Sequence, residues 1–191
     1  MNTQHLNLVC TVAPVVEPVT IGETKAAARI DGTEFDAILP GLIAAARQVA
    51  EQETGRRFIS QTWRASLTDW PTSADVLPFY QPTAVAVTYW NGSTFATLAT
   101  NAYVWANVGR GISLAPALTT SWPTATEVAI GPRVRVDVTL GQASAGNVDD
   151  CARTYIKALV AWWVANPEAT AANTRQAAPF LASLLDPLRL Y

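Results

Sequence analysis

Few residues of this chain could do chemistry, and the sequence does not bring them together. The only histidine is His5, near the start of the chain, and a Ser-His-Asp or Cys-His arrangement would have to use it. No CxxC or HExxH spacing occurs, so no metal site is predicted. Gly109-Arg110-Gly111 is too short for a phosphate-binding loop, and no helix is expected after it.

Two cysteines and one carboxylate pair have structural explanations. Cys10 and Cys151 lie far apart, and we interpret them as two small buried hydrophobic side chains. Asp149 and Asp150 are adjacent, so on a helix they point in different directions. In a first turn their charge would stabilise the helix dipole. We therefore expect no catalytic residue, no cofactor, no metal and no enzymatic activity.

The composition indicates a protein that associates. Half of the 191 residues are hydrophobic, seven are tryptophan, and only 15% are charged, against about 25% in an average domain. This balance suggests that a partner covers part of the surface, although a monomer with an apolar surface would have the same composition. The net charge of −2, with no long basic run, argues against a nucleic-acid-binding module.

No segment suggests a membrane protein or an exported one. An uninterrupted run of about 18 apolar residues is absent, so no transmembrane helix is predicted. The segment from Met1 to Val9 lacks the basic start and long apolar run of a signal peptide. We expect a cytoplasmic protein.

Helical signals come first in the chain. Residues 1–19 are predicted to be an extended arm that lies on a neighbouring subunit or on its own domain. Thr20 and Glu23 have capping-box spacing, which predicts a helix to about Arg29. A second helix, N-capped by Thr33, is predicted to end at Gly55, with a kink at the internal Pro40.

A period of two then replaces the helical period. Alternation from Arg133 to Leu140 is the clearest, and Asn91-Gly92 predicts a two-residue hairpin. Further strands are predicted near 63–67, 85–89, 95–98, 103–107 and 112–114. These strands predict an antiparallel sheet with one wet face.

The chain returns to helices at its end. A third helix is predicted to begin at Asn147 and to stop at Pro167, and a last one to span 176–185. Around Trp162 the third helix is apolar on all sides, so it needs two covering surfaces. The segregated order predicts an α+β fold, a small helical bundle from both chain ends with an inserted antiparallel β-rich subdomain. We expect an arm at 1–19, helical parts at 20–56 and 143–191, and the insertion at 57–142.

Several segments, in order, resemble the head–tail connector (adaptor) family of long-tailed bacteriophages and gene transfer agents. They are Glu17-Pro18-Val19-Thr20, Lys25-Ala26-Ala27-Ala28-Arg29-Ile30-Asp31, Leu42-Ile43-Ala44-Ala45-Ala46-Arg47, Gln61-Thr62-Trp63, Leu77-Pro78, Gln81-Pro82, Leu140-Gly141, Ala161-Trp162-Trp163 and Leu184-Leu185-Asp186-Pro187-Leu188-Arg189. The resemblance covers nearly the whole chain, and each motif alone is weak.

The resemblance implies a structural subunit of the virion neck. Copies would form a ring, expected to be a dodecamer, between the portal protein and a downstream connector or tail protein, and DNA would pass through without specific binding. Assembly would take place in the bacterial cytoplasm. The expected portal-binding residues are Phe180, Leu184, Leu185, Leu188, Arg189 and Tyr191. The expected subunit-interface residues are Trp162, Ala165, Arg56 and Arg57.

Two other readings stay open. A tail-side completion protein, a stopper or terminator of the same kind of particle, would bind the tail tube and not the portal. A small-molecule binding domain would place its pocket in the β-rich insertion, where aromatic residues gather.

Overall fold

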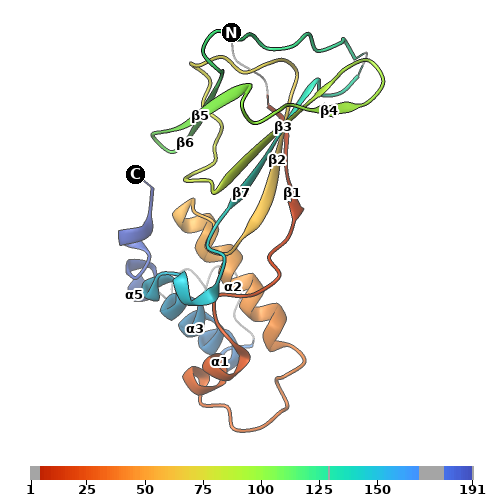
Figure 1. Cartoon of the computed structure of the whole chain (residues 1–191). Helices are drawn as coiled ribbons and strands as arrows, with labels where there is room; N and C mark the ends of the chain where they lie inside the picture. Colours follow the sequence, from red (N-terminus) through yellow and green to blue (C-terminus); the bar gives the residue numbers. More distant parts are fainter. Residues whose placement is uncertain (1–4, 129, 168–178, 191) are drawn as a thin grey trace. The chain divides into compact units, whose positions relative to one another are not determined.

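The computed structural model describes residues 5–128, 130–167 and 179–190, and it divides into two compact units (Figure 1). The β unit joins Met1–Ala13 to Ser60–Gly141, and the helical unit joins Pro14–Ile59 to Gln142–Tyr191. The fold is α+β, as predicted, with the helical unit built from both sides of the β-rich segment.

The helical unit contains α1 (Ile21–Ala28), α2 (Leu39–Thr54), α3 (Asp150–Ala165) and α5 (Pro179–Ser183). Two 3-10 turns belong to the same unit: η1 (Ala145–Asn147) precedes α3, and η2 (Asp186–Leu188) follows α5. Its core is one cluster of buried side chains contributed by α2, α3 and the segments around them: Val19, Leu39, Ile43, Ala46, Ala50, Phe58, Ile59, Val148, Ala152, Tyr155, Ile156, Leu159, Val160, Leu185 and Leu188.

The helix ends follow their capping residues. The predicted capping box is present, because Thr20 Oγ1 accepts from the Glu23 N–H and Glu23 Oε2 accepts from the Thr20 N–H. Gly55 ends α2 in the left-handed conformation, with φ +74°. The kink predicted at Pro40 is wrong. Because α2 begins at Leu39, Pro40 lies in the first turn, where its missing N–H costs no helical hydrogen bond.

The predicted starts of the other helices also need correction. Residues 34–38 form turns and not a helix, so the second helix is capped at Ile38 and not at Thr33. Asn147 belongs to η1, and α3 begins after Asp149, whose side chain accepts from the Cys151 N–H at 2.9 Å. Of the predicted last helix at 176–185, residues 176–178 lie outside the described residues and α5 ends at Ser183.

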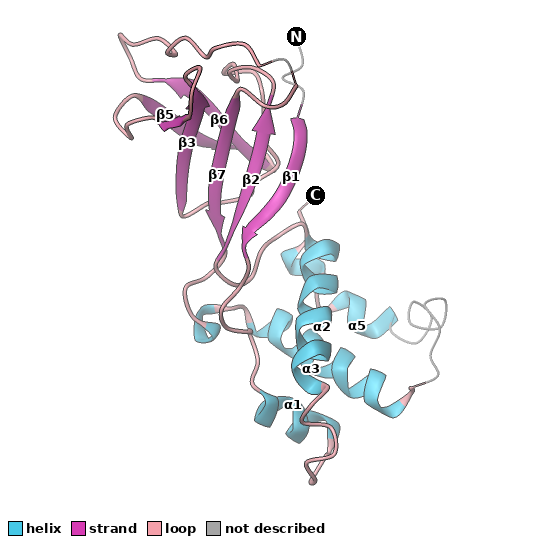
Figure 2. Ribbon diagram, turned by 90° about the vertical axis from the view of Figure 1, so that its right-hand side faces the viewer, coloured by secondary structure: helices cyan, strands magenta, loops and turns pink. Residues whose placement is uncertain are grey.

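The β unit contains a five-stranded antiparallel sheet in the order β1-β2-β7-β3-β4, and Figure 2 shows β1, β2, β7 and β3 side by side. The strands are β1 (His5–Val12), β2 (Gln61–Leu67), β3 (Ala84–Trp90), β4 (Phe95–Thr97) and β7 (Val134–Leu140). A separate hairpin joins β5 (Tyr103–Val108) to β6 (Gly111–Pro116).

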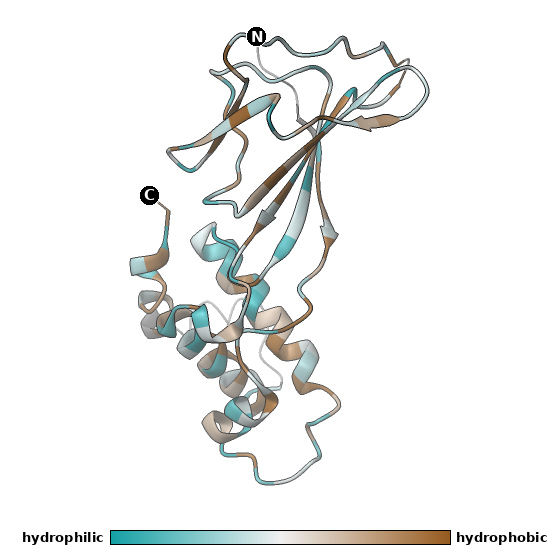
Figure 3. Cartoon of the chain, in the orientation of Figure 1, coloured by the Kyte–Doolittle hydropathy of each residue, from teal (hydrophilic) through white to brown (hydrophobic). Residues whose placement is uncertain are grey.

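Alternation along β7 separates the two faces of the sheet. Val134, Val136, Val138 and Leu140 are buried, whereas the residues between them are half-buried. Figure 3 shows the hydrophobic colour along β3, whose Val85 and Val87 belong to the same core. The hairpin supplies further core residues, Tyr103, Ile112 and Leu114.

One sequence prediction fails in the β unit. The segment 91–94 is a four-residue connection in which Asn91 Oδ1 accepts from the Ser93 and Thr94 N–H groups, so Asn91-Gly92 does not form a two-residue hairpin. The predicted arm at 1–19 contains β1, which pairs with β2 at the edge of the sheet.

Candidate interaction surfaces

The described residues hold no recognisable catalytic or metal centre. No group of three or more His, Cys, Asp and Glu side chains that could hold a metal ion occurs among them. Gly109-Arg110-Gly111 forms the turn between β5 and β6 and leads into a strand. His5 begins β1. Within this described part, none of the helices has the length and hydropathy that a bilayer crossing needs.

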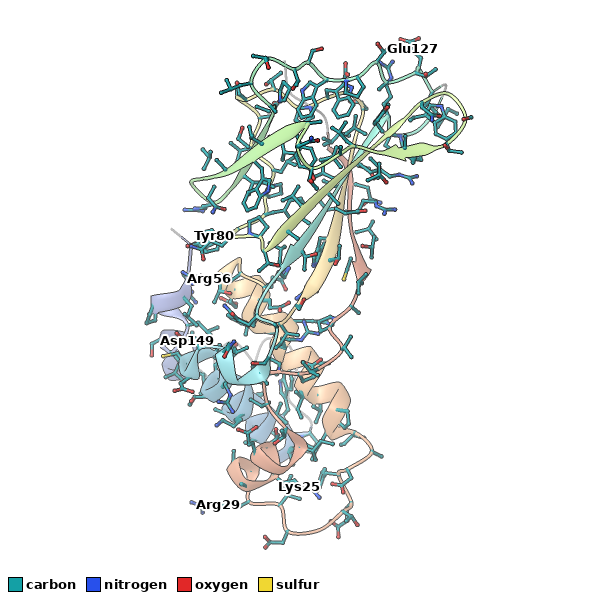
Figure 4. All side chains as sticks on the ribbon, viewed as in Figure 1. Lys25, Arg29, Arg56, Tyr80, Glu127 and Asp149 are labelled. Carbon is teal, nitrogen blue, oxygen red and sulfur yellow. The ribbon has the colours of Figure 1, made fainter. Side chains whose placement is uncertain are left out.

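Asp149 and Asp150 stabilise the start of α3. Asp149 is the N-cap of α3, and Asp150 lies in its first turn, 3.6 Å from Arg153 Nη1. Both carboxylates therefore stabilise the start of the helix, as the sequence predicted. Asp149 is labelled in Figure 4.

The two cysteines lie in different units, and both are free and half-buried. Burial, together with the negative charges of Asp149 and Asp150, raises the pKa of the Cys151 thiol. Because the thiolate is the nucleophile, this environment makes Cys151 a poor one.

A buried ion network fastens the start of the helical unit to α2. The Arg47 side chain is only 5% exposed, and its Nε lies 2.8 Å from Glu17 Oε2 while its Nη1 lies 3.0 Å from Glu51 Oε2. The other oxygen of Glu51 accepts from the Phe58 N–H. The network therefore joins the segment before α1, the middle of α2 and the segment that follows α2. Sequence analysis did not single it out, although Arg47 and Glu51 have i,i+4 spacing.

A second arginine links the two sequence segments of the helical unit. Arg153 Nη2 lies 2.5 Å from Glu23 Oε1, and its Nε donates to the Pro18 carbonyl at 3.2 Å. Hydrogen bonding from the Thr20 backbone, opposed by burial and helped by the Thr20 hydroxyl and Arg153, lowers the pKa of Glu23. The capping box of α1 thus also binds α3.

The residues predicted to bind the portal divide into buried and surface positions. Leu185 is fully buried and Leu188 nearly so, and both belong to the core of the helical unit, whereas Leu184 is half-buried against it. Arg189 pairs with Glu53 at 3.2 Å. Phe180 lies in α5 without a described side chain, and Tyr191 lies outside the described residues.

The C-terminal segment is therefore docked on its own unit. The Leu190 N–H donates to the Thr54 carbonyl at 3.2 Å, and its side chain lies beside Gly55. Leu185 and Leu188 are thus buried within the helical unit, and portal binding by the C-terminal segment stays a prediction.

The residues predicted for the subunit interface lie on the surface of the helical unit. Trp162 is half-buried and Ala165 is exposed, whereas Trp163 packs against the core. Arg56, labelled in Figure 4, and Arg57 follow α2 directly and are half-buried. Their role in a subunit contact stays a prediction.

The face of the sheet that lies opposite the core carries arginines that are already engaged. Arg64 donates two hydrogen bonds to Asp137, at 2.6 and 2.7 Å. This pairing raises the pKa of Arg64. The Arg135 guanidinium carbon lies 3.5 Å from the centroid of the Phe95 ring. Arg133 Nη2 lies 3.0 Å from Glu127 Oε1. The β unit has four basic and four acidic residues, so it offers no net attraction to phosphates.

The aromatic residues of the β unit pack on one another. Trp70 and Trp122 are stacked, with ring centroids 4.6 Å apart, and Trp122 Nε1 donates to the Pro71 carbonyl. The aromatic residues that suggested a ligand pocket pack against other side chains of the unit. Trp63, Tyr89 and Trp105 lie against the core, and Trp90 lies against Phe95.

Comparison with known proteins places the fold. No family model and no curated protein matches the chain. Among solved structures, a chain of the "Neck of empty GTA particle computed with C6 symmetry" matches with a TM-score of 0.76 and 21% identity, over 97% of this chain and 96% of that one. A chain of the "Virion of native gene transfer agent (GTA) particle" matches with a TM-score of 0.75 and 22% identity, over the same shares.

A third match comes from the "Neck of native GTA particle computed with C12 symmetry". Its TM-score is 0.65 and its identity 23%, over 95% of this chain and 96% of that one. The chain therefore has, over nearly its whole length, the fold of proteins that stand in the neck of gene transfer agent particles. The α+β fold predicted from the order of helices and strands is confirmed, and these matches agree with the resemblance to the head–tail connector family.

Proposed function

We propose that this chain is a head–tail connector (adaptor) subunit, and that identical copies form a ring in the neck of a phage or a phage-like particle. The ring would stand between the portal protein and a downstream connector or tail protein and would extend the DNA channel. The observation that carries the proposal is the end-to-end likeness to neck proteins, two of them in necks computed with C6 or C12 symmetry.

The chemistry of the surface supports a structural role. A ring repeats one contact between two different surface patches, so every copy needs two surfaces that bind other copies. A low content of charged residues fits this need, and so do the twelve large hydrophobic side chains that are exposed in the described part of the chain. The engaged arginines of the β unit suit a conduit, because DNA must move past it without being held.

For the ring contact we propose the surface of the helical unit around Trp162 and Ala165, with Arg56 and Arg57 as a further contact. For the portal contact we propose the exterior of the C-terminal segment. Leu184 and Arg189 are the described members with side chains within reach of a partner. Phe180 and Tyr191 complete the proposed set.

The test is a measurement of mass by size-exclusion chromatography with light scattering. The chain is measured alone over a wide range of concentration, and then mixed with the portal protein or the tail tube protein of the same particle. We expect concentration-dependent growth from monomer to a closed ring and co-elution with the portal protein. Co-elution with the tail tube alone would assign a stopper or terminator role. A monomer under every condition would refute the ring.

A further inference from the structure

The edge strand β1 has no partner strand on its outer side among the described residues, and it carries no charge. It pairs only with β2 and is the first strand in the sheet order. The chain has no Lys, Arg, Asp or Glu before Glu17. Proteins that keep such an edge exposed usually protect it with charged residues or proline, because a free edge pairs with other chains. β1 contains neither, although its pairing with β2 shifts register near both ends.

Both faces of β1 also expose aliphatic side chains. Leu8 and Val9 are neighbours and therefore point to opposite faces, and they are 40% and 45% exposed. Val12 is 53% exposed. These three residues form what we call the edge patch. A covering chain would thus gain backbone hydrogen bonds from the edge together with apolar contacts on either side of it.

The β5–β6 hairpin carries a second uncharged apolar surface. Val104, Ala106 and Val108 share one face of β5, where Val104 is 55% and Val108 44% exposed. Val76 is 45% exposed and lies beside Gly111, the residue that pairs with Val108. We call these four residues the hairpin patch. The only charge in the hairpin is that of Arg110, in its turn.

The hairpin patch is held in place by close backbone contacts. Leu77 and Ile112 exchange two backbone hydrogen bonds, at 2.8 and 2.9 Å, and Ser113 Oγ donates to the Ser73 carbonyl. A Cβ at Gly111 would lie 2.1 Å from the Leu77 carbonyl oxygen, so only glycine permits this approach. The patch is therefore rigid before any partner arrives.

The two patches lie in different parts of the same unit. The Tyr103 hydroxyl donates to the Val85 carbonyl at 2.7 Å, which sets the hairpin over β3. β2 and β7 separate β3 from β1, a distance of roughly 14 Å across the sheet at the usual spacing of strands. A contact between unlike patches leaves one of each kind free on the outer copies, so it can repeat until a ring closes.

We infer that the edge patch of one copy docks on the hairpin patch of the next copy, in addition to the ring contact proposed for the helical unit; this inference rests on the proposed ring. The occupant is a second copy because this chain itself carries both surfaces. The β unit has equal numbers of basic and acidic residues, so neighbouring units do not repel each other through net charge. Burial of the valine and leucine side chains of the two patches then drives the association.

The first experiment puts charge on the edge patch. Val9→Lys/Val12→Lys changes two exposed side chains, so the fold should persist, as checked by circular dichroism and melting temperature. We expect the concentration needed for half assembly to rise at least about ten-fold. Leu118→Lys is the matched control, because Leu118 is 93% exposed in a loop and belongs to neither patch.

The second experiment tests which patches meet. In a Cys10→Ser/Cys151→Ser background, chains carrying Leu8→Cys are mixed with chains carrying Val104→Cys and oxidised. We expect disulfide-linked dimers in the mixture and none from either chain alone. Dimers from the Leu8→Cys chain alone would show that two edges pair with each other, and this would overturn the inference.

The outcomes separate this inference from the proposed function. Normal assembly of the double lysine variant overturns the inference and leaves the ring intact. Failure of the unchanged chain to assemble, alone or with the portal protein, overturns both. Loss of assembly in the lysine variant, normal assembly of Leu118→Lys and cross-links only in the mixture together support the docking.

Discussion

In the helical unit, segments that leave the helices are fastened by arginines that bind carboxylates, whereas the edge of the β unit is left open. Arg47 holds the segment before α1, Arg153 holds the capping box, and Arg189 holds the C-terminal segment. β1 has backbone bonds to β2 and one hydroxyl contact, from Thr11 to the Thr62 carbonyl. The helical unit thus hides its chain segments, and the β unit keeps an uncharged edge that another chain can cover.

The difference separates two uses of polar residues. In the helical unit, ion pairs fix the position of segments that could otherwise detach. In the β unit, neither β1 nor the hairpin patch contains a charged residue, and the Arg64 and Arg133 side chains are engaged within the unit. We therefore place stability tests in the first unit and assembly tests in the second.

The largest expected effect comes from the buried network. Arg47→Ala removes the cation that lies 3.0 Å from the buried Glu51 carboxylate, and losing one partner of a buried pair costs about 3–5 kcal/mol. The free energy of unfolding, followed by circular dichroism at 222 nm in a urea titration, should fall by about that amount. A loss below about 1 kcal/mol would mean that the network does not hold the helical unit.

The docked C-terminal segment gives the next effect. Leu185→Ala removes a fully buried side chain and should lower the free energy of unfolding by about 3 kcal/mol. Leu184→Ala, at a half-buried position in the same segment, is the matched control and should cost less. Equal losses, measured in the same urea titration, would contradict the packing described for this segment.

The capping box of α1 should give an intermediate effect. Thr20→Ala removes the acceptor for the Glu23 N–H and should cost about 1 kcal/mol. Thr20→Ser, which keeps the acceptor, should restore most of the loss. Thermal unfolding monitors both variants.

The same box predicts a pH dependence. The folded pKa of Glu23 is lowered from its ordinary value of 4.5, so its stabilisation is complete above about pH 4.5 and is lost as the pH falls through the folded pKa. Glu23→Gln should therefore flatten the part of the stability curve that lies below about pH 4.5. An unchanged acid slope in the variant would contradict this role.

The smallest effect is expected on the open sheet face. The Arg64 and Asp137 side chains are 34% and 21% exposed, and solvent screens such a pair. Arg64→Ala should lower the free energy of unfolding by about 0.5 kcal/mol. A loss as large as that of Arg47→Ala would remove the contrast between the two units.

The sequence predicted most elements because their signals are local. Thr20 with Glu23, Gly55 after α2 and the alternating valines of β7 each specify their own conformation within a few residues. The predictions at Pro40 and Asn91 were wrong because each residue type suits more than one kind of position. Proline fits a first turn as well as a kink, and an asparagine side chain can organise a four-residue connection as well as a two-residue turn.

The remaining features depend on partners distant in sequence. β1 looks like an arm because its strand pairing is with β2, more than fifty residues later. The fastening of Arg47 to Glu17 spans thirty residues, and Leu185 and Leu188 are buried by helices from both ends of the unit. The exposed surfaces were the least predictable part, since one periodic pattern serves equally for a core and for an interface.

Hydrogen exchange of β1 tests most directly whether another copy covers the open edge. Peptides spanning residues 5–12 are compared by mass spectrometry between dilute monomer and the assembled form, with α2 peptides as the internal reference. Our account predicts fast exchange of the outward amides of β1 in the monomer and marked protection in the assembly, with α2 unchanged. Equally fast exchange of β1 in a fully assembled sample would contradict it.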